Sequence, residues 1–268
     1  MPQLNLLIIR YGALGDTLTL VPLLYLIRKT FPEFNITVSI NVMYSEFISK
    51  YCSFIKEFDL KFLNKPDLSK YDFIFPVVSS MNSTLSIHLK SLNLTNMNFA
   101  DMEYCEKSGF HVYKYLINTF SNYYKINENI VMPSDFFSEY NSEIKLKKML
   151  FHPGSGSKTK NLSKQEIENT IKKYCLSYEN TDVLMGPAEL KDIELQNIFF
   201  DYNCIKNVSG MEKLIKIIKQ YYNYIGLDSG ISHLAGLCGL KCSIIFKKSN
   251  FMVWSPFGKN ISIDFLGD

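Results

Sequence analysis

The hydrophobic pattern of the first half of the chain predicts short buried strands that alternate with helices. The run Leu4–Arg10 is apolar on both faces, as in a strand buried inside a parallel sheet. Two glycines follow this run, and a helical pattern of apolar residues then continues to Thr30. Pro76 predicts that the strand containing it ends early. The other elements predicted in this half are strands at Asn35–Val42, Tyr71–Val78 and about Asn98–Met102, and a helix at about His111–Tyr124.

The second half repeats this alternation after a polar segment, Pro133–Lys148, that is typical of an interdomain linker. Ser163 is followed three residues later by Glu166, which predicts the start of a helix with a capping box. The predicted strands are Lys148–His152, Asp182–Met185, Cys204–Val208, Tyr222–Asp228, Lys241–Phe246 and Ile261–Phe265. The predicted helices are Ser163–Tyr174, Glu189–Phe200, Met211–Gln220 and Ser232–Leu237.

Strands and helices that alternate through short connections are typical of a mainly parallel sheet covered by helices. Because the pattern occurs twice, we expect an α/β protein with two Rossmann-like lobes whose mainly parallel sheets face a cleft. The expected domains are residues 1–140 and residues 148–268.

Composition and charge exclude several classes of protein. Of 268 residues, 47% are hydrophobic and 21% are charged, as in globular proteins and unlike disordered or fibrous ones. The 29 Lys and Arg residues against 26 Asp and Glu residues give a net charge of +3. Without a concentrated basic face, we expect no nucleic-acid partner. The longest apolar run, Leu18–Ile27, is too short for a membrane span, which needs about 20 residues.

The cysteines and the N-terminal residues predict a cytoplasmic protein. The cysteines are scattered without a C-x-x-C pair, which favours free thiols in a reducing compartment. A signal peptide is not expected, because the sequence lacks a basic start and a cleavage site of small residues. The cysteines are Cys52, Cys105, Cys175, Cys204, Cys238 and Cys242. Lys213, Lys216 and Lys219 follow one side of a predicted helix, interpreted as a solvated face, with a membrane surface contact as the alternative.

The first loop with candidate chemistry is Arg10–Asp16, directly after the first predicted strand. It contains only a G-x-x-G core, and no acidic residue ends the second strand, so a nicotinamide-dependent dehydrogenase is not expected. Asp16 falls at the start of a helix, where a carboxylate is stabilised as an anion. An ordinary N-terminal helix charge is the simpler interpretation of this residue.

Three loops in the second half have residues that suit a nucleotide. His152–Lys160 combines glycines, hydroxyl side chains and two lysines, and groups of these kinds bind phosphate oxygens. It is not a P-loop, in which Lys-Ser or Lys-Thr directly follows the last glycine. Gly226–Gly236 places small residues at a strand end where a helix begins, a natural diphosphate site. Leu184–Glu189, which contains Gly186, places the acidic residue Glu189 at another such corner. The simpler alternatives are a flexible surface loop, a helix histidine at His233 whose hydrogen bonds are satisfied within the protein, and an ordinary helix charge at Glu189.

Taken in order, these loops resemble glycosyltransferase family 9, the ADP-heptose:lipopolysaccharide heptosyltransferases and their relatives. The segment RYGALGD, with Pro22 and Phe31-Pro32 downstream, is similar to the opening of that family, and HPGSGSKTKNLS is similar to its HPG loop. GLDSGISHLAGLCG resembles the DSGxxHLAxAxG signature, the most specific of these motifs. Trp254–Gly258 resembles the family's W-x-P-x-G segment, so the resemblance spans residues 4–258.

The resemblance implies a GT-B fold, with the acceptor on the first domain and the nucleotide-sugar on the second. Asp16 would be the catalytic base. Lys160 would contact the donor phosphates, since its spacing to Leu162 fits better than that of Lys158. The other implied donor-binding residues are Ser155, Gly156, Gly186, Glu189 (for the ribose), Asp228, Ser229, Gly230, Ser232 and His233. The implied acceptor-side residues are Arg10, Gly12 and Gly15.

The implied reaction is inverting, metal-independent transfer of a heptose or similar sugar to lipopolysaccharide or another surface glycan. The donor would be a nucleoside-diphosphate sugar, expected to be ADP-linked, and no cofactor is implied. The chain has no Asp-x-Asp motif for a metal-bridged diphosphate, so a lysine and a helix dipole would neutralise the leaving group. The protein would be bacterial and cytoplasmic, with the inner membrane and a second copy of the chain as further candidate partners.

Two other functions stay open at this point. One is a non-catalytic nucleotide-sugar-binding or scaffold protein of the same fold, and the other is a GT-B nucleotide-sugar epimerase. The sequence also departs from the family at two places. Leu162-Ser163 stand where Trp-Pro is usual, and Lys247-Lys248-Ser249 replace the usual Gly-Pro-Thr. The first domain has no obvious basic cluster for a phosphorylated lipid acceptor.

Overall fold

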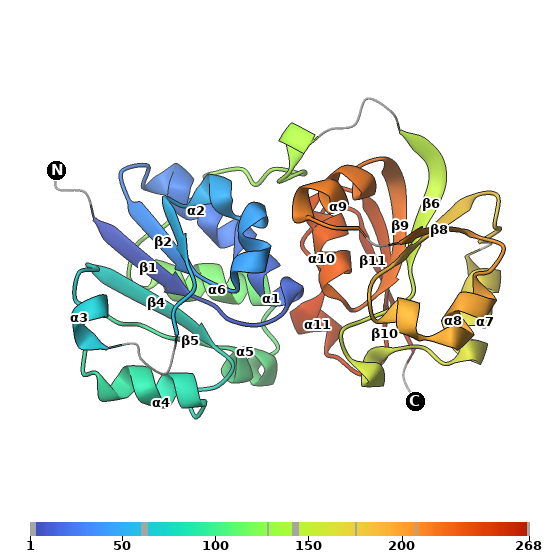
Figure 1. Ribbon diagram of the computed structural model, residues 1–268. Coiled ribbons are helices and arrows are strands. Elements are labelled where there is room, and N and C mark those ends of the chain that lie inside the picture. The colour runs from blue at the N-terminus through green and yellow to red at the C-terminus, as the bar shows by residue number, and fades with distance from the viewer. Residues whose placement is uncertain are drawn as a thin grey trace. The chain divides into compact units, whose positions relative to one another are not determined.

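A computed structural model describes residues 4–59, 64–127, 129–140, 145–174, 176–206 and 208–266. The chain divides into two compact units, Met1–Met132 and Pro133–Asp268, referred to below as the first and second unit. Each unit contains one parallel sheet flanked by helices, which confirms the predicted α/β class (Figure 1). Residues 133–140, which the sequence analysis placed in the first domain, belong to the second unit.

The first unit has a five-stranded sheet in the order β3-β2-β1-β4-β5, and every recorded strand pairing in it is parallel. Leu6, Leu7, Ile8 and Ile9 of the central strand are fully buried, as expected for a strand covered on both faces. The strands are β1 (Asn5–Ile9), β2 (Asn35–Ser39), β3 (Phe54–Lys56), β4 (Phe73–Val78) and β5 (Ala100–Asp101). The helices are α1 (Leu14–Leu18), α2 (Val21–Thr30), α3 (Lys65–Leu68), α4 (Thr84–Ser91), α5 (Met102–Ser108) and α6 (Val112–Ser121), with 3₁₀ turns η1 (Val42–Phe47) and η2 (Ser49–Tyr51).

Two prolines act differently in this unit from what the sequence pattern predicted. The single helix predicted up to Thr30 is divided into α1 and α2, because Pro22 lacks the N–H that a continuous helix needs. The early end predicted at Pro76 is wrong, since β4 continues to Val78. The backbone of Ile74 forms hydrogen bonds with Asn96 and Asn98, just before β5. Alternate residues of a strand face the same neighbour, so Pro76 lacks its N–H on the β5 side, where only Val77 and Val78 of β4 pair with β5. The short elements β3, α3, α4 and α5 were not predicted.

The second unit has a six-stranded sheet in the order β11-β10-β9-β6-β7-β8, again with parallel pairings throughout. Its strands are β6 (Leu146–His152), β7 (Thr181–Met185), β8 (Asn203–Lys206), β9 (Tyr221–Leu227), β10 (Lys241–Phe246) and β11 (Ile261–Phe265). Its helices are α7 (Lys164–Lys173), α8 (Ile193–Ile198), α9 (Met211–Ile218), α10 (Gly230–Leu237) and α11 (Phe251–Trp254). Its 3₁₀ turns are η3 (Ser138–Tyr140), η4 (Lys158–Lys160) and η5 (Glu189–Lys191). One of its cores packs Phe151, Ile225 and Leu227 of the central strands against Ile167 of α7.

The predicted elements of the second unit are largely confirmed. The capping box is present, because the Ser163 side chain accepts from the Glu166 backbone and the Glu166 side chain accepts from Ser163. The helix predicted from Glu189 begins later, since Glu189 opens a 3₁₀ turn and Asp192 caps α8. β6 begins at Leu146, inside the predicted linker. Asn207, within the strand predicted at Cys204–Val208, lies outside the described residues.

The solvated lysine face predicted along α9 is wrong at its last member. Lys213 and Lys216 are exposed, but Lys219 is fully buried, forms an ion pair with Asp135 and donates to the Phe137 carbonyl at 2.9 Å. The Phe136 N–H donates to the Leu237 carbonyl at the end of α10 at 2.8 Å. The buried lysine therefore anchors the segment that opens the second unit.

No helix in the described ranges is long and apolar enough to cross a membrane. The five cysteines that the structure describes are free thiols, and Cys175 lies outside the described residues.

Candidate functional site

The candidate residues of the first unit gather where β1 ends. Strands of a parallel sheet present their carboxyl ends at one edge, where the following loops bind ligands. Arg10 follows β1 directly, and Asp16 lies in the first turn of α1. Arg10 and Asp16 form an ion pair in which the arginine side chain is 4% exposed and the aspartate side chain is 34% exposed. The edge therefore presents a carboxylate to solvent and keeps the matching cation inside.

The loop between Arg10 and Asp16 is shaped around the carboxylate. The Ala13 N–H donates to Asp16 Oδ2 at 2.8 Å, so the side chain turns back over the loop. A Cβ on Gly12 would collide with the Asp16 carboxylate, which explains glycine at this position. Gly15 lies inside α1 and its carbonyl accepts from Thr19. Burial lowers the pKa of Arg10, and the neighbouring Asp16 opposes that shift.

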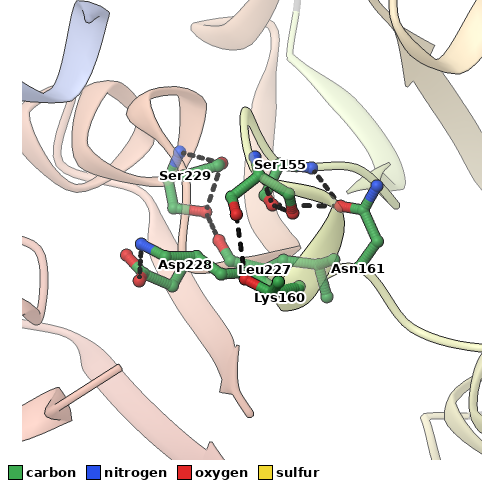
Figure 2. A network of polar contacts seen from close by, with 9 residues as sticks. Ser155, Lys160, Asn161, Leu227, Asp228 and Ser229 are labelled. Atoms are coloured by element: carbon green, nitrogen blue, oxygen red, sulfur yellow. Dashed lines mark hydrogen bonds and ion pairs between the residues drawn. The ribbon is translucent and has the colours of Figure 1, made fainter. Parts of the chain in front are cut away.

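In the second unit the loop after β6 is closed by its own side chains. The Asn161 side-chain oxygen accepts from the Ser155 N–H at 2.9 Å, and Ser155 Oγ lies 3.0 Å from the same oxygen (Figure 2). Ser155 Oγ also lies 2.9 Å from the Ser157 carbonyl. Gly156 is exposed at the tip of the loop, with open space where a Cβ would be. The loop is therefore held in one shape, and its backbone at Gly156 is accessible to a ligand.

Lys160 and Asp228 meet at this edge from loops 68 residues apart in the sequence. Lys160 Nζ donates to Asp228 Oδ2 at 2.6 Å (Figure 2). The lysine side chain is 36% exposed and the aspartate side chain is 8% exposed. Here the cation faces solvent and the carboxylate is buried beneath it. A lysine amine has three donors, and Asp228 occupies one.

The start of α10 lies directly after Asp228. Ser229 is the N-cap, and its hydroxyl accepts from the Ser232 N–H at 3.3 Å. The Ser232 hydroxyl is fully buried and donates to the Leu227 carbonyl at 2.5 Å, so it is engaged inside the unit. Gly230 opens the helix, and His233 is buried in its first half. Ser229 and Gly230 are partly exposed, so they are the residues of this turn through which a ligand could reach the start of the helix.

Glu189 and His152 form a buried layer between two of the candidate loops. Glu189 is buried, and its Oε2 accepts from the Gly186 N–H at 2.8 Å. A Cβ on Gly154 would collide with the other oxygen of the same carboxylate. His152 Nδ1 lies 2.9 Å from the Leu184 carbonyl. Burial lowers the pKa of His152, and the charge of Glu189 opposes that shift.

Two residues at this edge were not assigned a role from the sequence. Asn161 closes the β6 loop, and Lys247, which follows β10, donates to Glu166 Oε2 at 2.8 Å. The position of Lys247 at the carboxyl end of a predicted strand was the available signal. Among the residues that the structure describes, no group of three or more His, Cys, Asp or Glu side chains is placed to hold a metal ion.

Comparison with solved structures finds the same architecture in several glycosyltransferases. The chain matches Escherichia coli heptosyltransferase WaaC solved with ADP, with a TM-score of 0.69 and 11% identity over 98% of this chain and 93% of that one. It matches a glycosyltransferase family 9 structure from Veillonella parvula with a TM-score of 0.74 and 13% identity, covering 99% of this chain and 87% of that one. Escherichia coli ADP-heptose LPS heptosyltransferase II gives 0.66 and 12%, covering 97% and 90%.

No protein-family model matches the sequence, and no curated protein matches it. With identities this low, the likeness to solved structures concerns the fold. The expected fold is confirmed: the chain has the two-unit α/β fold of the glycosyltransferase family 9 heptosyltransferases.

Proposed function

We propose that the chain is a glycosyltransferase that moves a sugar from a nucleoside-diphosphate donor to a glycan acceptor. The likeness in fold to heptosyltransferases, one of them solved with ADP, supports this class. The observation that carries the proposal is the opposite exposure of two ion pairs. Arg10–Asp16 presents a carboxylate at the edge of the first sheet, and Lys160–Asp228 presents an ammonium group at the edge of the second.

The second unit is the proposed donor-binding unit. Lys160 has two donors besides the one that contacts Asp228, and the start of α10 adds backbone N–H groups and the positive end of a helix dipole. The exposed backbone N–H of Gly156, at the tip of the loop after β6, is a further proposed donor. Glu189, held against Gly186, is the proposed partner of the ribose hydroxyls. These groups would stabilise the negative charge that develops on the leaving diphosphate.

Asp16 is the proposed base. Its carboxylate takes the proton of the acceptor hydroxyl as that oxygen attacks the anomeric carbon of the donor sugar. The bond from that carbon to the diphosphate breaks with its electron pair on the departing phosphate oxygen. A single displacement of this kind inverts the anomeric centre and balances without a metal ion. Arg10, buried behind the carboxylate, orients it.

The finer assignment follows from the sequence resemblance. The proposed donor is an ADP-linked heptose or similar sugar, and the proposed acceptor is lipopolysaccharide or another surface glycan. The proposed location is the bacterial cytoplasm, with peripheral contact at the inner membrane and self-association as further proposals.

Nucleotide binding tests the donor assignment most directly. We expect ADP to raise the melting temperature of the full chain more than UDP, GDP or CMP. In isothermal titration calorimetry, Lys160→Met should weaken ADP binding by about ten- to hundredfold, since a charge-assisted hydrogen bond contributes about 1.5–3 kcal/mol. The matched control is Lys158→Met, two residues away in the same 3₁₀ turn and exposed, which should change affinity by less than about twofold.

Melting curves of the unliganded variants show whether each one folds. A chain whose stability responds to no nucleotide, or an ADP affinity equal in Lys160→Met and Lys158→Met, contradicts the donor assignment. Tight ADP binding with no sugar transfer or donor hydrolysis would instead support a non-catalytic binding protein of this fold.

A further inference from the structure

A second lysine at the edge of the second sheet is held in a fixed position by a network of its own. Lys247 Nζ donates to Glu166 Oε2 at 2.8 Å. The same oxygen accepts from the Ser163 N–H at 2.7 Å and from the Ser163 hydroxyl at 2.8 Å. Ser163 and Lys247 are two positions at which the sequence departs from the family pattern, and the structure joins them through Glu166.

Strand pairing places Lys247 beside the proposed diphosphate site. β9 and β10 are parallel neighbours, with Leu227 opposite Ile245, and the Asp228 N–H donates to the Ile245 carbonyl at 3.1 Å. Lys247 therefore leaves the sheet level with Ser229, at the start of α10. Neighbouring strands lie about 4.8 Å apart, so the two backbones emerge side by side.

Lys160 approaches the same place from the other side. β9 lies between β10 and β6 in the sheet, and the loop after β6 carries Lys160. Its ammonium group contacts Asp228 at the end of β9. In the strand order, the loop that carries Lys160 thus follows the neighbour of β9 on one side, and the backbone of Lys247 follows its neighbour on the other.

The Lys247 network leaves binding capacity at the ammonium group. Glu166 occupies one of its three donors, and the side chain is partly exposed. Because Ser163 and the helix cap fix Glu166, the lysine loses less side-chain freedom on binding a ligand than a mobile lysine would. The neighbouring Lys248 is exposed and has no recorded ion pair among the described residues.

We propose that Lys247 is a second donor-binding cation that contacts the diphosphate of the nucleotide-sugar together with Lys160. This inference rests on the proposed function, since it needs a nucleoside diphosphate at the start of α10. Glu166 is a positioning residue in this scheme: it holds the Lys247 ammonium group and does not touch the donor. Two lysines match the charge of a diphosphate better than Lys160 alone.

Binding of ADP and AMP to matched lysine variants tests the proposal. By isothermal titration calorimetry on the full chain, Lys247→Met should weaken ADP binding by about five- to tenfold and AMP binding by less than about threefold. Lys247→Arg keeps the cation and its partner Glu166, so its ADP affinity should stay within about threefold of the unmodified chain. Lys248→Met removes the same charge from the next residue and should change ADP binding by less than about twofold.

The outcomes separate this inference from the proposed function. If Lys247→Met binds ADP as Lys248→Met does while Lys160→Met loses affinity, the second cation is wrong and the donor site stands. If the unmodified chain binds neither nucleotide, both proposals fail. Lys247→Met should fold, because Ser163 and Glu166 still cap α7 without the lysine, and a melting curve of the unliganded variant checks this.

Discussion

The two sheet edges use the same kind of ion pair in opposite ways. At the first edge the basic partner, Arg10, is buried and the acidic partner, Asp16, faces solvent. At the second edge the acidic partner, Asp228, is buried and the basic partner, Lys160, faces solvent. Each pair has no net charge, yet the first offers a proton acceptor and the second offers a cation. Which member is buried therefore decides the chemistry that an edge can perform.

A third ion pair shows that a buried cation alone does not make a site. Lys219 is as deeply buried as Arg10, and its partner Asp135 is partly exposed. This pair lies just before β9, at the amino edge of the second sheet, where it anchors the opening segment of the unit. The loops that bind ligands in α/β sheets follow the carboxyl ends of the strands. We therefore assign the Lys219 pair to stability.

Removing the exposed carboxylate of the first edge should have the largest effect. Asp16→Asn takes away the proposed base but keeps an oxygen for the Ala13 N–H. Sugar transfer should fall by roughly 10²–10⁴-fold, while ADP affinity stays within about twofold. The measurements are turnover of the nucleotide-sugar by mass spectrometry and calorimetry with ADP.

Glu33→Gln is the control for this experiment, since Glu33 is an exposed acid after α2. A melting curve of Asp16→Asn is also needed, because the variant leaves Arg10 buried without its counter-ion. Full transfer activity in a folded Asp16→Asn variant would remove Asp16 as the base.

The pair at the amino edge should separate stability from function. Asp135→Asn leaves Lys219 buried without a counter-ion, so we expect the free energy of unfolding to fall by about 3 kcal/mol. Lys219→Met removes the buried charge itself and should cost less. The exposed Lys213→Met should stay within about 0.5 kcal/mol. Chemical denaturation measures all three, and a larger loss in Lys219→Met than in Asp135→Asn would contradict this ranking.

The smallest expected effect concerns the buried imidazole behind the second edge. The pKa of His152 is lowered by burial, so below about pH 6.5 the unfolded chain binds a proton that the folded chain does not. The stability of the chain should therefore decrease as the pH falls from 7 to 5.5. In His152→Asn, whose amide can donate to the Leu184 carbonyl, the loss of unfolding free energy between pH 7 and pH 5.5 should be smaller by less than about 1 kcal/mol.

Denaturation curves at pH 5.5, 6.25 and 7 measure the slope. Glu189 is the acid that faces His152, and its charge opposes the shift, so Glu189→Gln should steepen the dependence. Equal slopes in the unmodified chain and in His152→Asn would show that another group titrates in this range.

Local sequence signals predicted the regular elements well because their causes are local. Short apolar runs predicted β1, β4 and the six strands of the second unit, and the spacing of Ser163 and Glu166 predicted the capping box of α7. The division at Pro22 and the continuation of β4 through Pro76 were missed. Both depend on which hydrogen bonds the neighbouring chain segments need, and a proline shows only which donor is absent.

Candidate loops were found because glycine, hydroxyl and charged residues cluster in the sequence directly after buried strands. The contacts within these loops were not predictable in the same way. Lys219 was assigned to a solvated face because its spacing matches Lys213 and Lys216, but the segment around Asp135 covers it. The contact of Lys247 is with Glu166, 81 residues earlier in the chain.

The sequence by itself determined the α/β alternation, the two units and the loops of the proposed site, because strand burial, helix capping and loop composition depend on neighbouring residues. The tertiary structure alone decided the strand order, the partner of each lysine and the side of each ion pair that faces solvent. Burial depends on segments far apart in the chain, such as Lys160 and Asp228, which meet only when the parallel strands bring their ends to one edge.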